Sequence, residues 1–203
     1  MAKRLKRKAR DWPEIERQLA RLFDLLGLDL SQPDLVRTPG RVARMYKEIF
    51  AGHYTGQEPK ITVFPNDKKY TSMVIVRDVP FYSVCAHHII PFFGVGHMAY
   101  LPAARIAGLS KLARTLEFFA RRPQVQERLT EQVADFLNRK LEPRGVMVVL
   151  EARHLCMEMR GVEKPGSLTV TSTMRGLFED SAEGGRFRME FMNHIGRAGS
   201  VPR

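Results

Sequence analysis

Apolar residues at helical intervals predict two helices near the start of the chain. The first would follow Asp11 as its cap and carry on one face Ile15, Leu19, Leu22, Phe23 and Leu26. Thr38 and Pro39 mark a second start, an N-cap followed by proline at the first helical position. That helix would end at Gly52, so we expect residues 11–52 to form a helical arm.

After the arm, short runs rich in β-branched and aromatic residues predict strands. The predicted strands are residues 61–64, 72–76, 92–101, 146–159 and 168–174. A helix over 109–120 and a second one that restarts at Pro123 and runs to Pro143 lie between them. Gly184 and Gly185 mark a turn before a last short helix at 187–194. The order is typical of an α+β fold with an antiparallel sheet, and residues 53–203 would form its main domain.

The composition fits a globular protein in the cytoplasm. Of the 203 residues, 44% are hydrophobic and 27% are charged, which is ordinary for such a protein. The sequence has no apolar run of the roughly 18 residues that a membrane-spanning helix needs, and no signal peptide follows the basic start. We therefore expect a cytoplasmic location and no membrane partner.

The positive charge is concentrated at the N-terminus. Within residues 1–10, which contain no acid, the basic side chains are Lys3, Arg4, Lys6, Arg7, Lys8 and Arg10. Removing these six charges from the net charge of +11 leaves +5, which suits an anionic small molecule. Such a basic tail is typical of a disordered, solvated extension. Contact with nucleic acid or a membrane surface is the alternative, and we do not expect nucleic acid as a partner.

The two cysteines each lie beside histidine. Cys85 and His88 have a C-x-x-H spacing, and Cys156 follows His154 in a predicted strand, where alternation would place Glu158 and Arg160 on the same face. A disulfide is not expected in the cytosol, and inert core thiols are the alternative. Two cysteines and one histidine suit Zn²⁺, and three protein ligands leave a fourth position for water.

Three further sets of residues could support catalysis or binding. His87 and His154 could transfer protons near neutral pH, although a histidine in a strand can equally be a core residue. The helix start with Ser110, Lys111 and Arg114 could bind an anion, or be a solvated face. Glu127 falls in the first turn of the next helix, where an acid suits the helix dipole.

Together these residues resemble the GTP cyclohydrolase I family. The matching stretches appear in the family's order over residues 38–176: T-P-x-R-V-A-x-M-Y (38–46), V-C-x-H-H (84–88), P-F-x-G (91–94), A-Y-x-P (99–102), G-L-S-K (108–111), R-P-Q-V-Q-E-R-L-T (122–130) and H-x-C…R-G (154–161). The resemblance implies a tunnelling fold for residues 53–203, with sheets of neighbouring chains joined into a barrel. It also implies a homodecamer of two pentamers with active sites between subunits.

The resemblance further implies a reaction and a set of roles. GTP and water would become 7,8-dihydroneopterin triphosphate and formate, the entry to folate and other pterins. Zn²⁺ held by Cys85, His88 and Cys156 would activate the water that attacks C8 of guanine. His87 and His154 would move protons, and Ser110 would take part in the ribose rearrangement. The substrate-binding residues would be Gln126 and Glu127 for the guanine side, and Lys111, Arg114 and Arg160 for the triphosphate.

One position departs from the family pattern, and two other classes of protein share part of it. Ala86 stands where family members have glutamate, so we expect activity with altered efficiency. A non-catalytic zinc-binding relative would have lost His87, His154 or the cations, which are present. A nitrile reductase of the same fold would use NADPH and a cysteine free of metal, whereas both cysteines here lie beside histidines of the type that binds metal.

Overall fold

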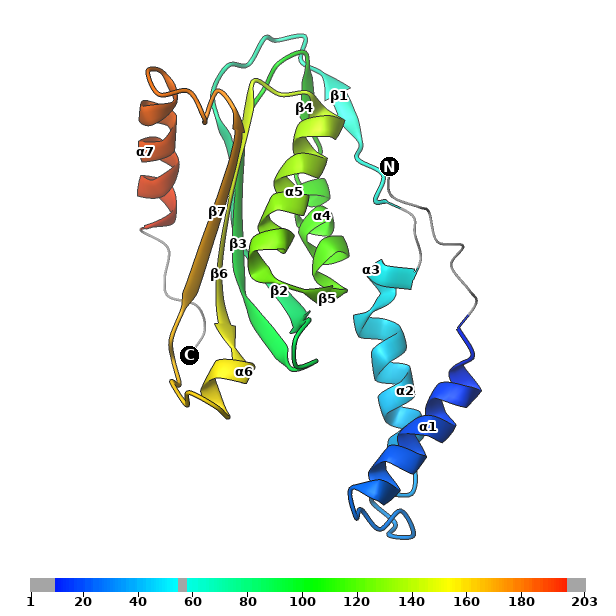
Figure 1. Cartoon of the computed structure of the whole chain (residues 1–203). Coiled ribbons are helices and arrows are strands. Elements are labelled where there is room, and N and C mark those ends of the chain that lie inside the picture. The colour runs from blue at the N-terminus through cyan, green and yellow to red at the C-terminus, as the bar shows by residue number, and fades with distance from the viewer. Residues whose placement is uncertain (1–9, 55–57, 197–203) are drawn as a thin grey trace, which may run out of the picture.

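The computed structural model describes residues 10–54 and 58–196, and its centre is a five-stranded sheet (Figure 1). In spatial order the strands are β5 (Pro123–Gln124), β2 (Val74–Cys85), β3 (Pro91–Leu101), β6 (Gly145–His154) and β7 (Thr169–Gly176). From β2 to β7 all neighbours pair antiparallel, as predicted, whereas the two-residue β5 pairs parallel with β2. The α+β class is confirmed.

Helices cover both faces of this sheet. α4 (Ser110–Ala120) and α5 (Gln126–Leu141) lie side by side on one face, and α7 (Gly184–Ile195) lies on the other (Figure 1). The alternation of β3 matches this arrangement, because Met98 and Tyr100 belong to the core cluster beneath α4 and α5, whereas Ala99 belongs to the cluster beneath α7. Burial on both faces fixes the register of the central strands.

The N-terminal arm projects away from this body (Figure 1). It consists of α1 (Trp12–Leu25), α2 (Thr38–Ile49) and α3 (Ala51–Tyr54). Asp11 caps α1 as predicted, because its carboxylate accepts a hydrogen bond of 3.0 Å from the Glu14 N–H. The start of α2 differs by one residue, since Arg37 occupies the cap position and Thr38 is already helical.

The second helix, α2, ends at Ile49, so Gly52 does not stop it, contrary to the prediction. Gly52 lies within α3, where a Cβ atom would come within 2.1 Å of the Phe118 carbonyl oxygen and 3.0 Å of the Arg121 carbonyl oxygen. Both carbonyls belong to the C-terminal end of α4. Glycine is therefore needed here because the arm approaches the body closely, not because a helix stops.

Other boundaries also differ from those predicted. The strand expected at 72–76 continues through Cys85, and Pro123 opens the edge strand β5 rather than a helix. Gly184 and Gly185 form the first turn of α7. The pairing of β1 (Val63–Pro65) with β4 (Arg105–Ala107) was not predicted, since β4 is too short to give a pattern.

The expectation of a disordered basic tail falls mostly on residues that the structure does not describe. Most of the basic tail, residues 1–9, and the C-terminal residues 197–203 lie outside the described residues. None of the helices in the described part of the chain has the length and apolarity that a membrane crossing requires.

Candidate metal centre

A tight turn after β2 presents Cys85 together with two histidines. The Cys85 N–H donates to the Ile90 carbonyl at 2.9 Å, and the Ile89 N–H donates to the Cys85 carbonyl at 2.9 Å. Ile89 has a φ of 55°, a left-handed conformation that a β-branched residue rarely adopts. The turn thus reverses the chain into β3 and leaves His87 and His88 exposed at its tip.

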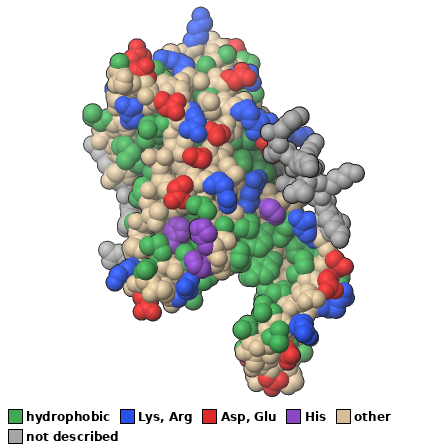
Figure 2. Space-filling model, in the orientation of Figure 1, with side chains coloured by type: hydrophobic (Ala, Val, Ile, Leu, Met, Phe, Trp, Pro, Cys, Tyr) green, Lys and Arg blue, Asp and Glu red, His purple; other side chains and the backbone are tan. Residues whose placement is uncertain are grey.

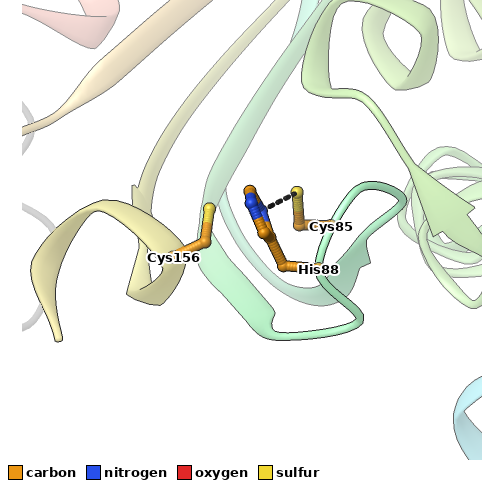
Figure 3. A group of neighbouring side chains, drawn as sticks. All are labelled: Cys85, His88 and Cys156. Carbon is orange, nitrogen blue, oxygen red and sulfur yellow. Dashed lines mark hydrogen bonds between the residues drawn. The ribbon is translucent and has the colours of Figure 1, made fainter. Parts of the chain in front are cut away.

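Cys156 lies near this turn, although it follows β6, a different strand of the sheet. It lies in the short helix α6 (Leu155–Glu158), which follows β6 directly. The ligand atoms of Cys85, His88 and Cys156 all lie within 4.8 Å of one another, and Figure 3 shows the three side chains pointing toward a common centre. The predicted trio is therefore brought together by the fold.

The spacing and chemistry of this trio fit Zn²⁺. Tetrahedral zinc with thiolate and imidazole ligands places the ligand atoms about 3.6–3.8 Å apart. The Sγ of Cys85 lies 3.9 Å from Nδ1 of His88, close to that separation. Cys85 is 7% exposed, so its sulfur is shielded, whereas His88 is exposed and leaves the site open to small molecules.

The local structure around Cys156 corrects the prediction that residues 146–159 form one strand. β6 ends at His154, so strand alternation does not place Cys156, Glu158 and Arg160 on a common face with it. The helical turn instead directs the Glu158 carboxylate back to Arg153, whose Nε lies 2.8 Å away. A strand would have carried Cys156 onward, whereas the turn holds it at the sheet end near Cys85.

The two remaining histidines lie beside the trio in different environments. His87 is exposed, and its Nδ1 lies 3.7 Å from Cys85 Sγ. His154 is half-buried at the end of β6, where its ring stacks on Phe92 with centroids 4.5 Å apart and planes 3° apart. Its Nε2 lies 2.7 Å from Oε1 of Gln126, the first residue of α5. No motif in the sequence indicates the stacking on Phe92 or the contact with Gln126.

Burial and neighbouring charges shift the pKa values at the site. Burial lowers the pKa of His154, and the charges of Glu127 and Glu158 oppose that shift. Burial raises the pKa of Cys156, as does the neighbouring Cys85, while the positive Arg160 acts in the opposite sense. The charges of Glu127 and Arg160, two predicted substrate ligands, thus affect the pKa values of His154 and Cys156 respectively.

Within one chain, the predicted anion-binding residues of α4 lie far from the trio. Ser110 and Lys111 begin α4, directly after β4, whereas the site lies at the other end of the sheet beside β5 (Figure 1). The helix between these ends is about 16 Å long. Arg114 is one turn further along and exposed. A single chain therefore does not bring these residues to the trio.

An apolar groove opens between the arm and the turn of the candidate site. It has a volume of about 420 Å³ and is lined by residues of α2, β2, the turn and the start of β3, among them Met45, Tyr82, Ile89 and Pro91. Figure 2 shows hydrophobic side chains gathered in the recess between arm and body, with histidines on the neighbouring surface. The arm thus adjoins the site without covering it.

Comparison with known proteins gives close relatives. The family model of GTP cyclohydrolase I matches residues 15–196. GTP cyclohydrolase 1 of Clostridioides difficile is 50% identical over 172 residues, 83% of this chain and 90% of that protein. GTP cyclohydrolase 1 of Mycobacterium tuberculosis is 50% identical over 175 residues, 85% of this chain and 86% of that protein. The crystal structure of the apo archaeosine synthase QueF-Like aligns with a TM-score of 0.45 at 15% identity, covering 53% of this chain and 97% of that one.

Fold and site together define an α+β protein with a Cys-His-Cys group that could hold a metal ion at the end of its sheet. The chain belongs to the GTP cyclohydrolase I family, since the family model and the relatives cover most of its length.

Proposed function

We propose that the protein is a zinc-dependent hydrolase that converts GTP and water to 7,8-dihydroneopterin triphosphate and formate, the first step of folate and pterin biosynthesis. The observation that carries the proposal is the Cys85, His88 and Cys156 trio in a chain 50% identical to a GTP cyclohydrolase 1 over 83% of its length. Three protein ligands leave a position for water, as is typical of catalytic zinc.

Cys85, His88 and Cys156 would hold the zinc ion, which when bound would lower the pKa of a water molecule to near neutrality. His154 would accept and return protons at the purine nitrogens and the ribose oxygen. Its half-buried ring is held by stacking on Phe92, which favours a fixed direction of proton transfer. His87, exposed on the turn, would share this role.

Glu127 would select guanine. Its carboxylate is exposed in the first turn of α5, close enough to lower the acidity of His154 through its charge. A carboxylate can accept hydrogen bonds from both N1–H and the 2-amino group of guanine, and adenine offers neither donor. Arg160, exposed beside Cys156, would contribute to binding the triphosphate.

We propose that the site is completed by another copy of the chain. The start of α4, with Ser110, Lys111 and Arg114, is the end of that helix away from the trio. These residues would supply the cations that bind a triphosphate and the hydroxyl that takes part in the ribose rearrangement. In a homodecamer of two pentamers, with sheets joined into a barrel, the start of α4 of one chain would face the trio of its neighbour.

The activity is tested with zinc-loaded protein and GTP. We expect a fluorescent pterin after oxidation, together with one formate per GTP, and loss of both on adding a chelator. Glu127→Gln should lower kcat/KM about 10²-fold because the amide keeps only one acceptor and sets its NH₂ group against the second guanine donor. Glu131→Gln, an exposed acid one turn further along α5, is the matched control and should leave kcat/KM unchanged. The absence of pterin and formate would refute the proposal, and NADPH consumption with a nitrile would favour the reductase alternative.

The shared site is tested by co-expressing two inactive variants, Cys156→Ser and Lys111→Ala. If chains share a site, mixed oligomers contain intact sites and recover part of the activity. If each site lies within one chain, co-expression recovers none. Light scattering on the wild-type protein gives the number of chains directly.

Ala86 is expected to affect efficiency rather than the reaction itself. Its N–H donates to the Gln124 carbonyl at 2.8 Å, so the backbone of the turn is anchored to β5 whatever side chain it carries. Ala86→Glu should therefore change kcat/KM without changing the zinc content per chain. Loss of zinc in Ala86→Glu would contradict this separation.

A further inference from the structure

The side chain of Gln126 is enclosed within the protein. The residue is 2% exposed, and its Nε2 lies 3.1 Å from the Leu150 carbonyl oxygen and 3.0 Å from the Thr169 carbonyl oxygen. Carbonyl oxygens can only accept hydrogen bonds, so the atom facing them must be the NH₂ group of the amide. The flipped orientation would set the amide oxygen against two other oxygens, which is unfavourable.

A chain of hydroxyl groups supports the same orientation. Thr130 Oγ1 donates to the Gln126 backbone carbonyl at 2.8 Å, which uses its only proton. The 2.7 Å bond between the hydroxyls of Thr130 and Thr171 must therefore be donated by Thr171. Thr171 is then free to accept from Gln126 Nε2, which lies 3.2 Å away. The NH₂ group of Gln126 therefore faces three acceptors, two carbonyls and one hydroxyl, and shares its two protons among them.

This orientation determines which nitrogen of His154 carries a proton. With NH₂ turned inward, the Gln126 Oε1 faces His154 Nε2 at 2.7 Å, and an amide oxygen can only accept. In the neutral ring, Nε2 therefore carries the hydrogen and Nδ1 carries the lone pair. Phe92 fixes the plane of the same ring by parallel stacking at 4.5 Å.

We propose that Gln126 is a positioning residue that fixes the His154 ring in the Nε2–H form and so leaves the lone pair on Nδ1. The inference rests on the proposed function of His154 and replaces the expected contact between Gln126 and the substrate. A buried amide whose donors and acceptor are all engaged by the protein has no group left for guanine.

Two variants and one control test this role in the zinc-loaded protein. Gln126→Met removes the acceptor, whereas Gln126→Glu keeps an oxygen toward His154 while losing the NH₂ group that faces the two carbonyls. Gln124→Met is the matched control, because Gln124 is 1% exposed and its amide bonds to Phe119 and Gln132 without touching a histidine. Its backbone carbonyl, which holds the turn, is retained.

The direct readout is a ¹H–¹⁵N correlation spectrum of the His154 ring at pH 8, where an imidazole is neutral. We expect protonated Nε2 in the wild type, in Gln126→Glu and in Gln124→Met, and loss of that single form in Gln126→Met. A protonated Nδ1 in the wild type would overturn the proposal whether or not the protein turns over GTP, so this result is independent of the proposed function.

Kinetics separate positioning from substrate binding. Gln126→Met should lower kcat about 10²- to 10⁴-fold, the range for loss of a correctly oriented proton-transfer group, with KM for GTP nearly unchanged. Gln126→Glu should recover a large part of kcat, and Gln124→Met should keep it. A purely structural role would make Gln126→Glu at least as damaging as Gln126→Met, and a substrate contact would raise KM with kcat retained. Either result would overturn the proposal.

Discussion

The rings of Phe92 and His154 lie parallel, 4.5 Å apart, at directly paired positions of β3 and β6. Phe92 is fully buried, so the core of the protein supports one face of a histidine at the candidate site. Because Phe92 is held in the core, its cross-strand contact restricts the motion of His154, the side chain proposed to transfer protons.

Replacing Phe92 with leucine should leave a folded protein with a poorly held His154. We expect kcat to fall about ten- to a hundredfold, with little change in KM, because the imidazole can rotate away from its productive direction. Phe81→Leu is the control, since Phe81 is also buried, contacts Phe92 edge-on at 6.0 Å and lies outside the site. Both variants should lose about 1–2 kcal/mol of stability. Equal activity in the two would show that stacking does not orient His154.

Removing one thiolate should abolish metal binding. After dialysis, wild-type protein is expected to retain about one zinc per chain, and Cys156→Ser close to none, because two remaining ligands hold the ion weakly. Met157→Ser changes the neighbouring, partly exposed residue of α6 without removing a ligand, and should keep the metal. Full zinc content in Cys156→Ser, measured by atomic emission, would exclude Cys156 as a ligand.

Gly52→Ala should weaken the attachment of the arm. The added methyl group would lie 2.1 Å from the Phe118 carbonyl oxygen, so α3 must move away from α4. Overpacking of this kind costs about 1–3 kcal/mol of unfolding free energy. Gly185→Ala offers a comparison, because its new methyl group meets only the Arg188 side chain at 3.8 Å. Urea unfolding measures the free energy of unfolding of both variants. A wild-type value for Gly52→Ala would mean that the arm packs differently.

His97 should make the protein less stable in mild acid. It is 1% exposed and its Nδ1 accepts from the Asp78 N–H at 3.2 Å, so the folded state favours the neutral ring. Burial lowers its pKa, Glu151 and Asp78 oppose this shift, and Arg77 adds to it.

The direction of this pH effect follows from how readily His97 is protonated in the folded and in the unfolded chain. Below the unfolded value of 6.5 the unfolded chain takes up a proton that the folded chain resists, so stability is lost as pH falls from 6.5 toward the lower folded pKa. The slope from one such group is at most about 1.4 kcal/mol per pH unit. His97→Asn keeps an acceptor without a titratable group, so its stability should fall less between pH 7.5 and 5.5, measured by urea unfolding at one protein concentration. Equal losses in both proteins would rule out His97 as the cause.

Much of the fold was predictable because it rests on local periodicity. The helices α1 and α5 and the strand β3 have strong patterns, and their predicted centres were right. Some errors fell on elements of two to four residues, such as β4, β5 and α6, where too few residues exist to show a period. The others were misplaced boundaries of longer elements, β2 and α7. Gly52 was misread because the carbonyl it accommodates belongs to a residue far along the chain.

The sequence by itself determined which chemistry is available: two cysteines, each beside histidine, and the motifs that matched a family. Only the tertiary structure decided the geometry. Strand pairing brought the end of β2, the start of β3 and the end of β6 to one edge, and a helical turn after His154 directed Cys156 toward Cys85. The tautomer of His154 depends on hydrogen bonds that Gln126 makes with β6 and β7. Side-chain types are local, but the direction of a lone pair is set by contacts between distant segments.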